Sequence, residues 1–197
     1  LSPNVSRSLF GKPFTTNALR MRDRQVAVEK PADVVRIALL GASMDMGWGI
    51  GTSETYVNLL EEWLNSHAAR QGSDRRFEVL NFAVAAYSPL QRLEAYRRKV
   101  KEFRPDLVLY SATTLDTRLM EIHLCDLFRA KADMHYDFLR QALVDAGVTP
   151  ADLELDVDER LVHKDVVKKK LRPFYWPIYD ATLGRLAAEC RSEGTAL

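Results

Sequence analysis

Short apolar runs recur along the first half of the chain. Residues 34–40 read Val-Val-Arg-Ile-Ala-Leu-Leu, rich in β-branched residues, and the run stops at Gly41. A nearly continuous apolar run of this length is typical of a strand that is buried on both faces, as in a parallel sheet. Two similar runs, at 77–82 and 106–111, predict a second and a third strand.

Helical patterns separate these runs. Apolar residues from Tyr56 to Leu64 recur at helical spacing. A second helix is predicted where Ser88, Pro89 and Gln91 form an N-terminal capping signature. The order strand, helix, strand, helix, strand implies right-handed crossovers. It therefore predicts a doubly wound parallel α/β sheet with helices on both faces.

The second half of the chain has helical patterns throughout. Four helices are expected, at about 117–131, 133–146, 158–171 and 176–193. This is more helix than one crossover between strands needs, so we interpret the region of about 117–193 as a helical insertion after the third strand. Residues 195–197 are expected to begin a fourth strand.

The beginning of the chain has no such pattern. Residues 1–33 hold Pro3, Pro13 and Pro31 and no sustained apolar period. We expect them to form an N-terminal arm on the surface, with parts disordered, ahead of an α/β domain at 34–197. Because the chain stops where the fourth strand would begin, we expect the C-terminal part of that domain to be missing from it.

The composition argues against several functional classes. The 197 residues carry a formal net charge of +1, so we expect no nucleic acid as a partner. Two cysteines are too few for a disulfide scaffold or a four-cysteine zinc site. The four histidines include no pair at i, i+4 and no HExxH, so no metal and no cofactor are expected. No apolar run is long enough to span a membrane.

The carboxyl ends of the strands are where an open α/β sheet places its reactive groups. Three loops meet this description, at 41–51, 83–88 and 112–118. The first contains Ser43, in a tight turn directly after a buried strand, where backbone N–H groups lie near an exposed hydroxyl. This placement suits a nucleophile. Serines in such turns also cap helices, and that interpretation stays open.

Several blocks of the sequence resemble those of the SGNH (GDSL-type) hydrolases. Residues 37–50, Ile-Ala-Leu-Leu-Gly-Ala-Ser-Met-Asp-Met-Gly-Trp-Gly-Ile, are similar to the first block, a strand that ends in Gly-Asp-Ser. Residues 81–88, Asn-Phe-Ala-Val-Ala-Ala-Tyr-Ser, are similar to the second, Asn-x-Gly-Val-x-Gly-Tyr-Ser. Residues 105–110 resemble the strand before the third block, Gly-x-Asn-Asp, and 16–23 resemble the lead-in TNxxGxRd.

The resemblance implies a flavodoxin-like, three-layer α/β/α fold. It also implies a serine esterase, deacylase or O-acyl transferase acting on a small or carbohydrate ester. Ser43 would be the nucleophile that forms an acyl-enzyme. The amides of Ser43 and Ala86, with the third-block asparagine, would hold the oxyanion. Trp48, Tyr87 and Asp116 are expected at the substrate pocket.

Four positions depart from the family pattern. Ala42 replaces the aspartate before the nucleophile, and Ala83 and Ala86 replace glycines of the second block. An alanine keeps the backbone N–H group and fits where the turn does not require a positive φ. Leu115 stands where the third-block asparagine is expected and cannot donate a hydrogen bond, so Thr114 is the expected substitute.

The family's general base, from a late Asp-x-x-His block, has no counterpart in the 197 residues. Either this block lies beyond Leu197 or catalysis has been lost. The second explanation makes the chain a non-catalytic binding or scaffold domain on the same fold, and both explanations are kept. Family members with this lead-in often carry an upstream membrane anchor, so the localisation stays open, as does the oligomeric state.

Four other features have alternative interpretations. His123 follows the third block and either faces the site or is a surface or capping residue. Cys125 and Cys190 are expected to be small buried hydrophobic residues. The basic run 168–170 is expected to be a solvated face, with a phosphate or membrane-surface contact as the alternative. The aromatic cluster 174–179 either packs in the core or forms a substrate wall.

Overall fold

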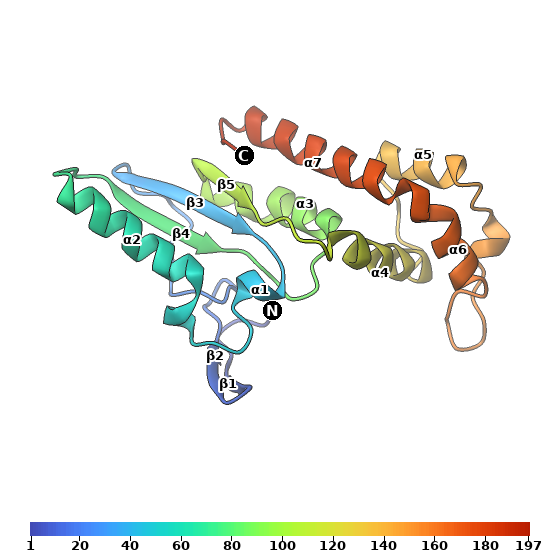
Figure 1. Cartoon of the computed structure of the whole chain (residues 1–197), viewed down its shortest axis with the longest axis horizontal. Helices are drawn as coiled ribbons and strands as arrows, with labels where there is room; N and C mark the ends of the chain where they lie inside the picture. The colour runs from blue at the N-terminus through green and yellow to red at the C-terminus, as the bar shows by residue number, and fades with distance from the viewer. The chain divides into compact units, whose positions relative to one another are not determined.

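The strands of the main sheet lie in the order β4-β3-β5 in the computed structural model, which describes residues 1–197 (Figure 1). β3 (Val34–Leu40) is the central strand, and β4 (Arg76–Asn81) and β5 (Leu107–Tyr110) pair with it in parallel, one on each side. β3 is buried almost throughout, as expected of a strand covered on both faces. The three predicted strands and the parallel α/β class are confirmed.

Helix α2 (Tyr56–Arg70) covers one face of this sheet. A buried apolar cluster joins the helix to β3 and β4, and its members are Ile37, Leu39, Val57 and Val79. Leu60 and Leu64 extend the cluster along the apolar side of α2, at the spacing that predicted the helix. The Thr55 hydroxyl accepts a hydrogen bond from the Asn58 N–H and caps the start of the helix.

Helix α3 (Pro89–Arg98) lies on the other side of the sheet from α2 (Figure 1). Leu80 of β4 points to this face and is fully buried, because side chains alternate along a strand. The 3-10 turn η2 (Val100–Phe103) follows α3 and sets Phe103 edge-on against Phe82, with ring centroids 5.1 Å apart. Crossovers on opposite faces of the sheet make the predicted doubly wound arrangement.

A fourth strand begins beside β5. Ala196 pairs in parallel with Leu107, and its backbone is hydrogen-bonded to Asp106 and Val108 at 3.0 and 2.8 Å. Helix α7 (Tyr175–Ser192) leads the chain to this position. Residues 195–197 thus lie beside β5, where a fourth strand was expected, and pair with it through a single bridge.

The chain forms two compact units. The first comprises residues 1–87, 91–112 and 186–197 and contains the sheet, and the second comprises residues 88–90 and 113–185 and is mainly helical. The second unit is inserted between β5 and the last turns of α7. The predicted helical insertion after the third strand is thus present.

The helices of the second unit share an apolar core. In chain order they are α4 (Asp116–Arg129), α5 (Asp137–Asp145), η3 (Pro150–Leu153), α6 (Lys164–Leu171), η4 (Arg172–Phe174) and most of α7. The buried core residues of this unit include Leu124, Phe128, Leu139, Leu171 and Ile178. No helix in the protein combines the length and the apolar character that crossing a membrane requires.

Two helices of this unit begin later than their patterns predict. α5 begins at residue 137 instead of 133, and α6 begins at 164 instead of 158. Before α6, Leu155 pairs with Leu161, and the Asp156 carboxylate accepts hydrogen bonds from the N–H groups of Asp158 and Arg160. This local turn takes the backbone donors that a helix would use, so the helix starts only after it.

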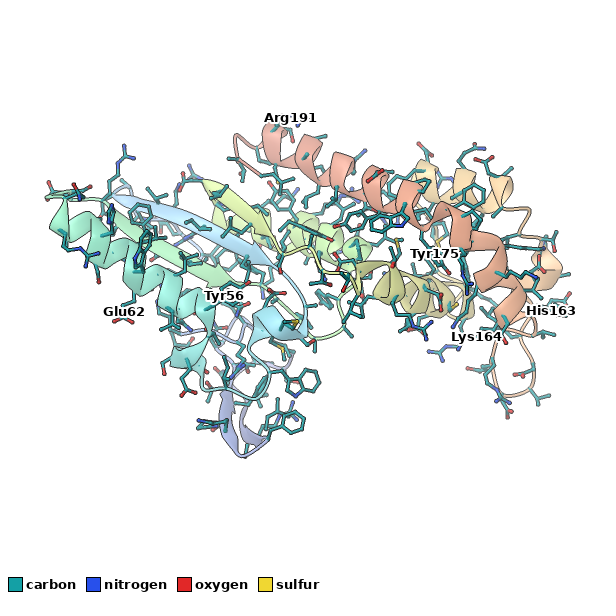
Figure 2. The ribbon with its side chains drawn as sticks, in the orientation of Figure 1. Tyr56, Glu62, His163, Lys164, Tyr175 and Arg191 are labelled. Carbon is teal, nitrogen blue, oxygen red and sulfur yellow. The ribbon has the colours of Figure 1, made fainter.

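The basic run 168–170 on α6 is not the solvated face that its sequence suggests. Lys168 forms an ion pair with Glu121 at 2.9 Å, and Lys170 forms one with Asp152 at 2.6 Å. Figure 2 shows the start of this helix, with Lys164 labelled. Only the middle lysine of the three is left without a carboxylate partner, so the run supplies no broad cationic surface.

The aromatic cluster 174–179 divides between core and surface. Tyr175 and Tyr179 are buried, whereas Trp176 is 64% exposed. The Trp176 and Tyr179 rings meet edge to face, with centroids 5.7 Å apart. Core packing, the first of the two interpretations, accounts for the two tyrosines and leaves Trp176 on the surface of the second unit.

The N-terminal arm is ordered, contrary to expectation. β1 (Ser6–Leu9) and β2 (Lys12–Thr15) form an antiparallel hairpin around a two-residue turn at 10–11, with φ angles of 51° and 75°. Phe14 is buried against Met46 and fixes the hairpin to the α/β unit. The pattern did not reveal this hairpin because its turn lacks the usual Asn-Gly or Asp-Gly signal.

Candidate active site

Ser43 lies directly beyond the carboxyl end of β3. It is the first residue of the short helix α1 (Ser43–Met46), its side chain is partly exposed, and its hydroxyl makes no hydrogen bond within the chain. A Cβ atom on Gly41 would come within 2.2 Å of the Asp45 carboxylate, so this position requires glycine. The strand and the glycine together present Ser43 at the edge of the sheet.

The Asp45 carboxylate holds the turn that carries Ser43. Its Oδ2 accepts a hydrogen bond from the Ala42 N–H at 2.7 Å, and its Oδ1 accepts one from the Tyr56 hydroxyl at 2.7 Å. Burial and the neighbouring carboxylate raise the pKa of Tyr56, so the tyrosine remains a donor. Figure 2 labels Tyr56 at the start of α2. Asp45 was not identified from the sequence, although an acid three residues after a helix cap is a recognised signal.

The second-block loop is tied to the same turn. Asn81 donates from Nδ2 to the Asp45 carbonyl at 3.0 Å and accepts from the Ala83 N–H at 3.0 Å. The Val84 N–H donates to the Gly41 carbonyl at 3.4 Å. Asn81 is buried, and both its amide nitrogen and its amide oxygen are hydrogen-bonded, so it fixes the loop after β4 to the loop after β3.

Ala86 adopts a left-handed backbone conformation, with φ of 64°. The family pattern has glycine here, and the turn keeps the geometry for which glycine is favoured. Neither the Ala86 N–H nor the Ser43 N–H donates a hydrogen bond within the chain. The two amides expected at an oxyanion site are therefore both free, at the cost of strain at Ala86.

Arg22, from the lead-in segment, shapes the glycine-containing loop after α1. It is buried and donates from Nη1 to the Met46 carbonyl at 2.6 Å and also to the Gly47 carbonyl, and from Nη2 to the Ile50 carbonyl. Its guanidinium lies over the Phe14 ring, 5.1 Å from the centroid. Burial lowers the pKa of Arg22. The TNxxGxRd resemblance was the only sign of this residue in the sequence.

Trp48 and Tyr87, the two aromatic candidates for the pocket, have different surroundings. The Trp48 N–H donates to the Ser43 carbonyl at 3.2 Å, and its ring, about half exposed, lies 6.1 Å from that of Phe10. The Tyr87 N–H donates to the Val84 carbonyl at 3.1 Å, and its side chain lines a separate cavity with Lys99. Both lie in the first unit, with Ser43 and Ala86.

The third-block residues lie in the second unit. Thr114 and Leu115 are exposed, and the Thr114 hydroxyl has no hydrogen-bond partner. Asp116 is buried and accepts hydrogen bonds from the Thr113 hydroxyl at 3.0 Å and the Tyr179 hydroxyl at 3.4 Å. The Asp116 carboxylate thus contributes to the start of α4 and its packing, and its expected place at a substrate pocket stays a prediction.

A second serine forms a pair with a histidine. In the second unit, Ser88 Oγ lies 2.8 Å from His123 Nδ1. Ser88 is completely buried, so the pair is closed to a substrate. Burial lowers the pKa of His123, which favours the neutral ring. The contact gives His123 a structural partner, and its expected place facing the site stays a prediction.

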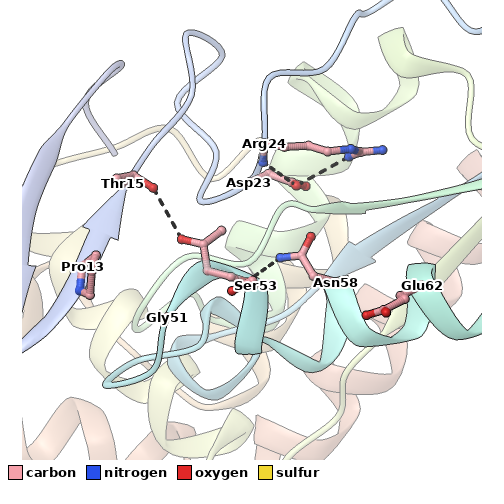
Figure 3. A pocket seen from close by; sticks show the side chains of 9 residues that line it. Pro13, Thr15, Asp23, Arg24, Gly51, Ser53, Asn58 and Glu62 are labelled. Carbon is pink, nitrogen blue, oxygen red and sulfur yellow. Dashed lines mark hydrogen bonds and ion pairs between the residues drawn. The ribbon is translucent and has the colours of Figure 1, made fainter.

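A polar cavity of about 590 Å³ lies between the hairpin, the 3-10 turn η1 (Thr52–Glu54) and α2 (Figure 3). Hydroxyl, amide and charged side chains line it: Thr15, Asp23, Arg24, Thr52, Ser53, Asn58 and Glu62. Burial is the main cause of a raised pKa for Asp23. The sequence patterns gave no sign of this cavity, because its walls come from three separated segments.

No group of three or more His, Cys, Asp or Glu side chains in residues 1–197 is arranged to hold a metal ion. Cys125 and Cys190 are free and buried, as expected. Burial raises the pKa of both thiols, so they remain protonated and unreactive at neutral pH.

The comparison with known proteins finds similarity at the level of structure. The chain is similar to GDSL-like lipases of known structure. The crystal structure of TesA shares 19% sequence identity, with 82% of this chain and 76% of that chain covered and a TM-score of 0.36. A GDSL-like lipase from Bacteroides thetaiotaomicron shares 14% identity, with 87% and 70% covered and a TM-score of 0.29. No protein-family model matches the chain, and a search of curated proteins finds no match.

Proposed function

We propose that the chain is an SGNH-type serine ester hydrolase, deacylase or O-acyl transferase with Ser43 as its nucleophile. One observation carries the proposal: the Ser43 hydroxyl and the N–H groups of Ser43 and Ala86 are all unpaired, on two loops joined at the carboxyl edge of a parallel sheet. Backbone donors without internal partners are what an oxyanion site requires.

In the proposed reaction, Ser43 Oγ attacks the carbonyl carbon of an ester. The Oγ–carbon bond forms, the bond to the leaving alcohol breaks, and the serine proton passes through a general base to that alcohol. Water, or another alcohol in a transfer reaction, then attacks the acyl-enzyme and releases Ser43. The amides of Ser43 and Ala86 stabilise the oxyanion, and the Thr114 hydroxyl is the proposed third donor in place of the family's asparagine.

The general base is the component that residues 1–197 do not provide. The histidine nearest to a serine, His123, is hydrogen-bonded to the buried Ser88. In the family that the sequence resembles, the base comes from an Asp-x-x-His block. The test of Ser43 below therefore rests on its reactivity and assigns the base to no residue.

The proposed substrate is a small or carbohydrate ester. Trp48, half exposed and bonded through its backbone to Ser43, and Phe10 beside it provide aromatic faces on which a sugar ring or an apolar acyl group can stack. The hydroxyl-rich cavity of Figure 3 is consistent with a polyol in the same unit. Asp116 and Tyr87 are kept as proposed pocket residues.

A fluorophosphonate probe tests the proposal, because it labels activated serines covalently. We expect full-length protein to be labelled and Ser43→Ala to lose at least nine-tenths of the label, since removal of the nucleophile removes the reaction. Ser66→Ala, at an exposed position of α2, is the matched control and should be labelled as the unchanged protein is. Equal labelling of full-length protein and Ser43→Ala would show that Ser43 is not the nucleophile.

A non-catalytic binding or scaffold domain is the second candidate. It is favoured by Ala42 and Leu115, which lack the side chains of the family pattern, and by Ser43 having no base as a hydrogen-bond partner. Hydrolysis of p-nitrophenyl acetate that Ser43→Ala abolishes would eliminate this candidate. Intact protein that neither hydrolyses the ester nor reacts with the probe would support it.

A further inference from the structure

A second cavity of the first unit, of about 200 Å³, has positive charges on its walls and no carboxylate. It lies between the second-block loop, the lead-in segment and the end of α3. Its charged side chains are those of Arg20 and Lys99. Phe82, Val84 and Tyr87 are among its other lining residues. Arg20 and Lys99 are nearly 80 positions apart in the sequence, so no local motif predicts that they lie together.

Lys99 enters this cavity without a counterion. Its Nζ donates to the Leu19 carbonyl and lies over the Phe82 ring, 5.6 Å from the centroid. It forms no ion pair, and its side chain is partly buried. The Leu19 carbonyl accepts from one of the three ammonium donors, so the others are left for another acceptor.

Arg20 is held beside Lys99 by a built turn. Its φ is 62°, and its N–H donates to the Asn17 carbonyl at 3.1 Å. The buried Asn17 side chain in turn accepts from the N–H groups of Leu19 and Met21 at 3.0 and 2.9 Å. The Arg20 guanidinium makes no hydrogen bond and no ion pair. A well-ordered loop therefore presents a free cation.

The two cations act on one another. Burial, and after it the charge of Arg20, lowers the pKa of Lys99. Two other cations of this unit have carboxylate partners: Arg36 pairs with Glu78 at 2.7 Å and Lys30 pairs with Asp106 at 2.6 Å. Two like charges that face one cavity without a carboxylate repel each other, and an anion between them removes that repulsion.

We propose that this cavity binds the oxyanion group of a small ligand, a carboxylate or a phosphate, between Lys99 Nζ and the Arg20 guanidinium. Arginine offers two parallel N–H donors to such a group and lysine a point charge. The volume accommodates one such group with a few further atoms. The ligand would contact Ala83, Val84 and Tyr87, on the loop that carries Ala86, but its binding does not depend on the chemistry of Ser43.

Isothermal titration calorimetry at low ionic strength tests the proposal, with inorganic phosphate and acetate as separate probes. We expect the protein to bind at least one of them, and Lys99→Met and Arg20→Met each to weaken binding about tenfold or more, because each loses a charge-assisted hydrogen bond. Lys99→Arg should keep binding within a few-fold. Binding should also weaken as sodium chloride is added.

Controls separate the cavity from general surface charge and from catalysis. Lys101→Met and Arg75→Met remove exposed cations elsewhere and should leave the affinity unchanged. Ser43→Ala should bind as the unchanged protein does, so loss of esterase activity and loss of anion binding are independent results. Binding of phosphate alone identifies a phosphate ligand and binding of acetate alone a carboxylate ligand.

Two results would overturn the proposal: no heat of binding with either anion, or an equal loss of affinity in the Lys101→Met and Arg75→Met controls. Arg20 is exposed, so Arg20→Met should fold even if Lys99→Met does not, and circular dichroism of each variant verifies this. As a second measurement, phosphate should raise the pKa of the Lys99 ammonium observed by NMR. An unchanged pKa at saturating phosphate would place the anion elsewhere.

Discussion

Single residues decide the shape of the two loops that carry the candidate site. Gly41 leaves room for the Asp45 carboxylate, and Ala86 takes a φ of 64° that a side chain makes unfavourable. The replacement of a family glycine by Ala86 was visible in the sequence, but the backbone strain that it causes was not. Whether alanine is harmless depends on the backbone conformation, which only the structure reveals.

We predict that Ala86→Gly raises the free energy of unfolding by about 0.5–1 kcal/mol. A residue with a side chain in this region costs roughly 1–2 kcal/mol, and the extra chain entropy of glycine offsets part of the relief. Urea unfolding measures the change. Ala188→Gly, at an exposed position of α7, is the control and should lower the free energy of unfolding by about 1 kcal/mol. A loss of stability in both variants would contradict strain at Ala86.

At the scale of elements, a contact within the second unit joins the start of α3 to α4. It is made by Ser88, the residue before α3, and His123 of α4. Ser88 Oγ and His123 Nδ1 lie 2.8 Å apart, and a neutral ring whose Nδ1 carries no proton would accept a hydrogen bond from the hydroxyl. Burial lowers the pKa of His123, and the weaker effect of Asp126 opposes the shift. The contact therefore gives the packing of α4 a dependence on pH.

Protonation of His123 should destabilise the fold in mild acid. Its folded pKa lies below the unfolded value of 6.5, so below about pH 6.5 the unfolded chain binds a proton that the folded chain does not. The free energy of unfolding should thus fall between pH 7.5 and pH 5, and His123→Gln should reduce that fall. Urea unfolding at both pH values measures it. His67→Gln on α2 is the control and should leave the fall in the free energy of unfolding unchanged. If His67→Gln reduces that fall as much as His123→Gln does, the assignment to His123 is wrong.

Elements with a clear apolar period could be predicted from the sequence, and elements held by other contacts could not. β3, β4, β5 and α2 follow from their patterns because burial on known faces determines them. The hairpin of β1 and β2 was not predicted because its turn has no strong signal and few apolar side chains, Phe14 and Leu9 among them, anchor it. The hairpin packs against Met46 and Ala83, which lie much later in the sequence, so no local pattern predicts it.

The same distinction applies to the candidate site at the scale of the whole molecule. Ser43 and Ala86 could be located because motifs are local, and their place at the strand ends follows from the topology. The contacts of Arg22 and Lys99 could not be predicted, because each joins segments distant in sequence. In the sequence these residues look like any other charged residues. Only the structure shows which of them have a partner of opposite charge.

Arg36 is the residue that joins most parts of the first unit. It interrupts the apolar run of the central strand, yet its side chain is 0% exposed. Its guanidinium donates to the Glu78 carboxylate at 2.9 and 2.7 Å, and to the carbonyls of Val28 and Phe103 at 2.8 and 2.9 Å. One side chain thus fixes the arm, β3, β4 and the end of η2 to one another.

Arg36→Met should therefore lower the free energy of unfolding by about 3–5 kcal/mol. It leaves the partly buried Glu78 without its partner and the two backbone carbonyls without donors, and the loss of a buried partner is costly because the remaining charge stays uncompensated. Arg76→Met, which breaks the exposed pair with Asp33, should cost no more than about 1 kcal/mol. Urea unfolding compares the two at one pH. Similar small losses in both variants would show that Arg36 does not organise the unit, and its burial would then need another explanation.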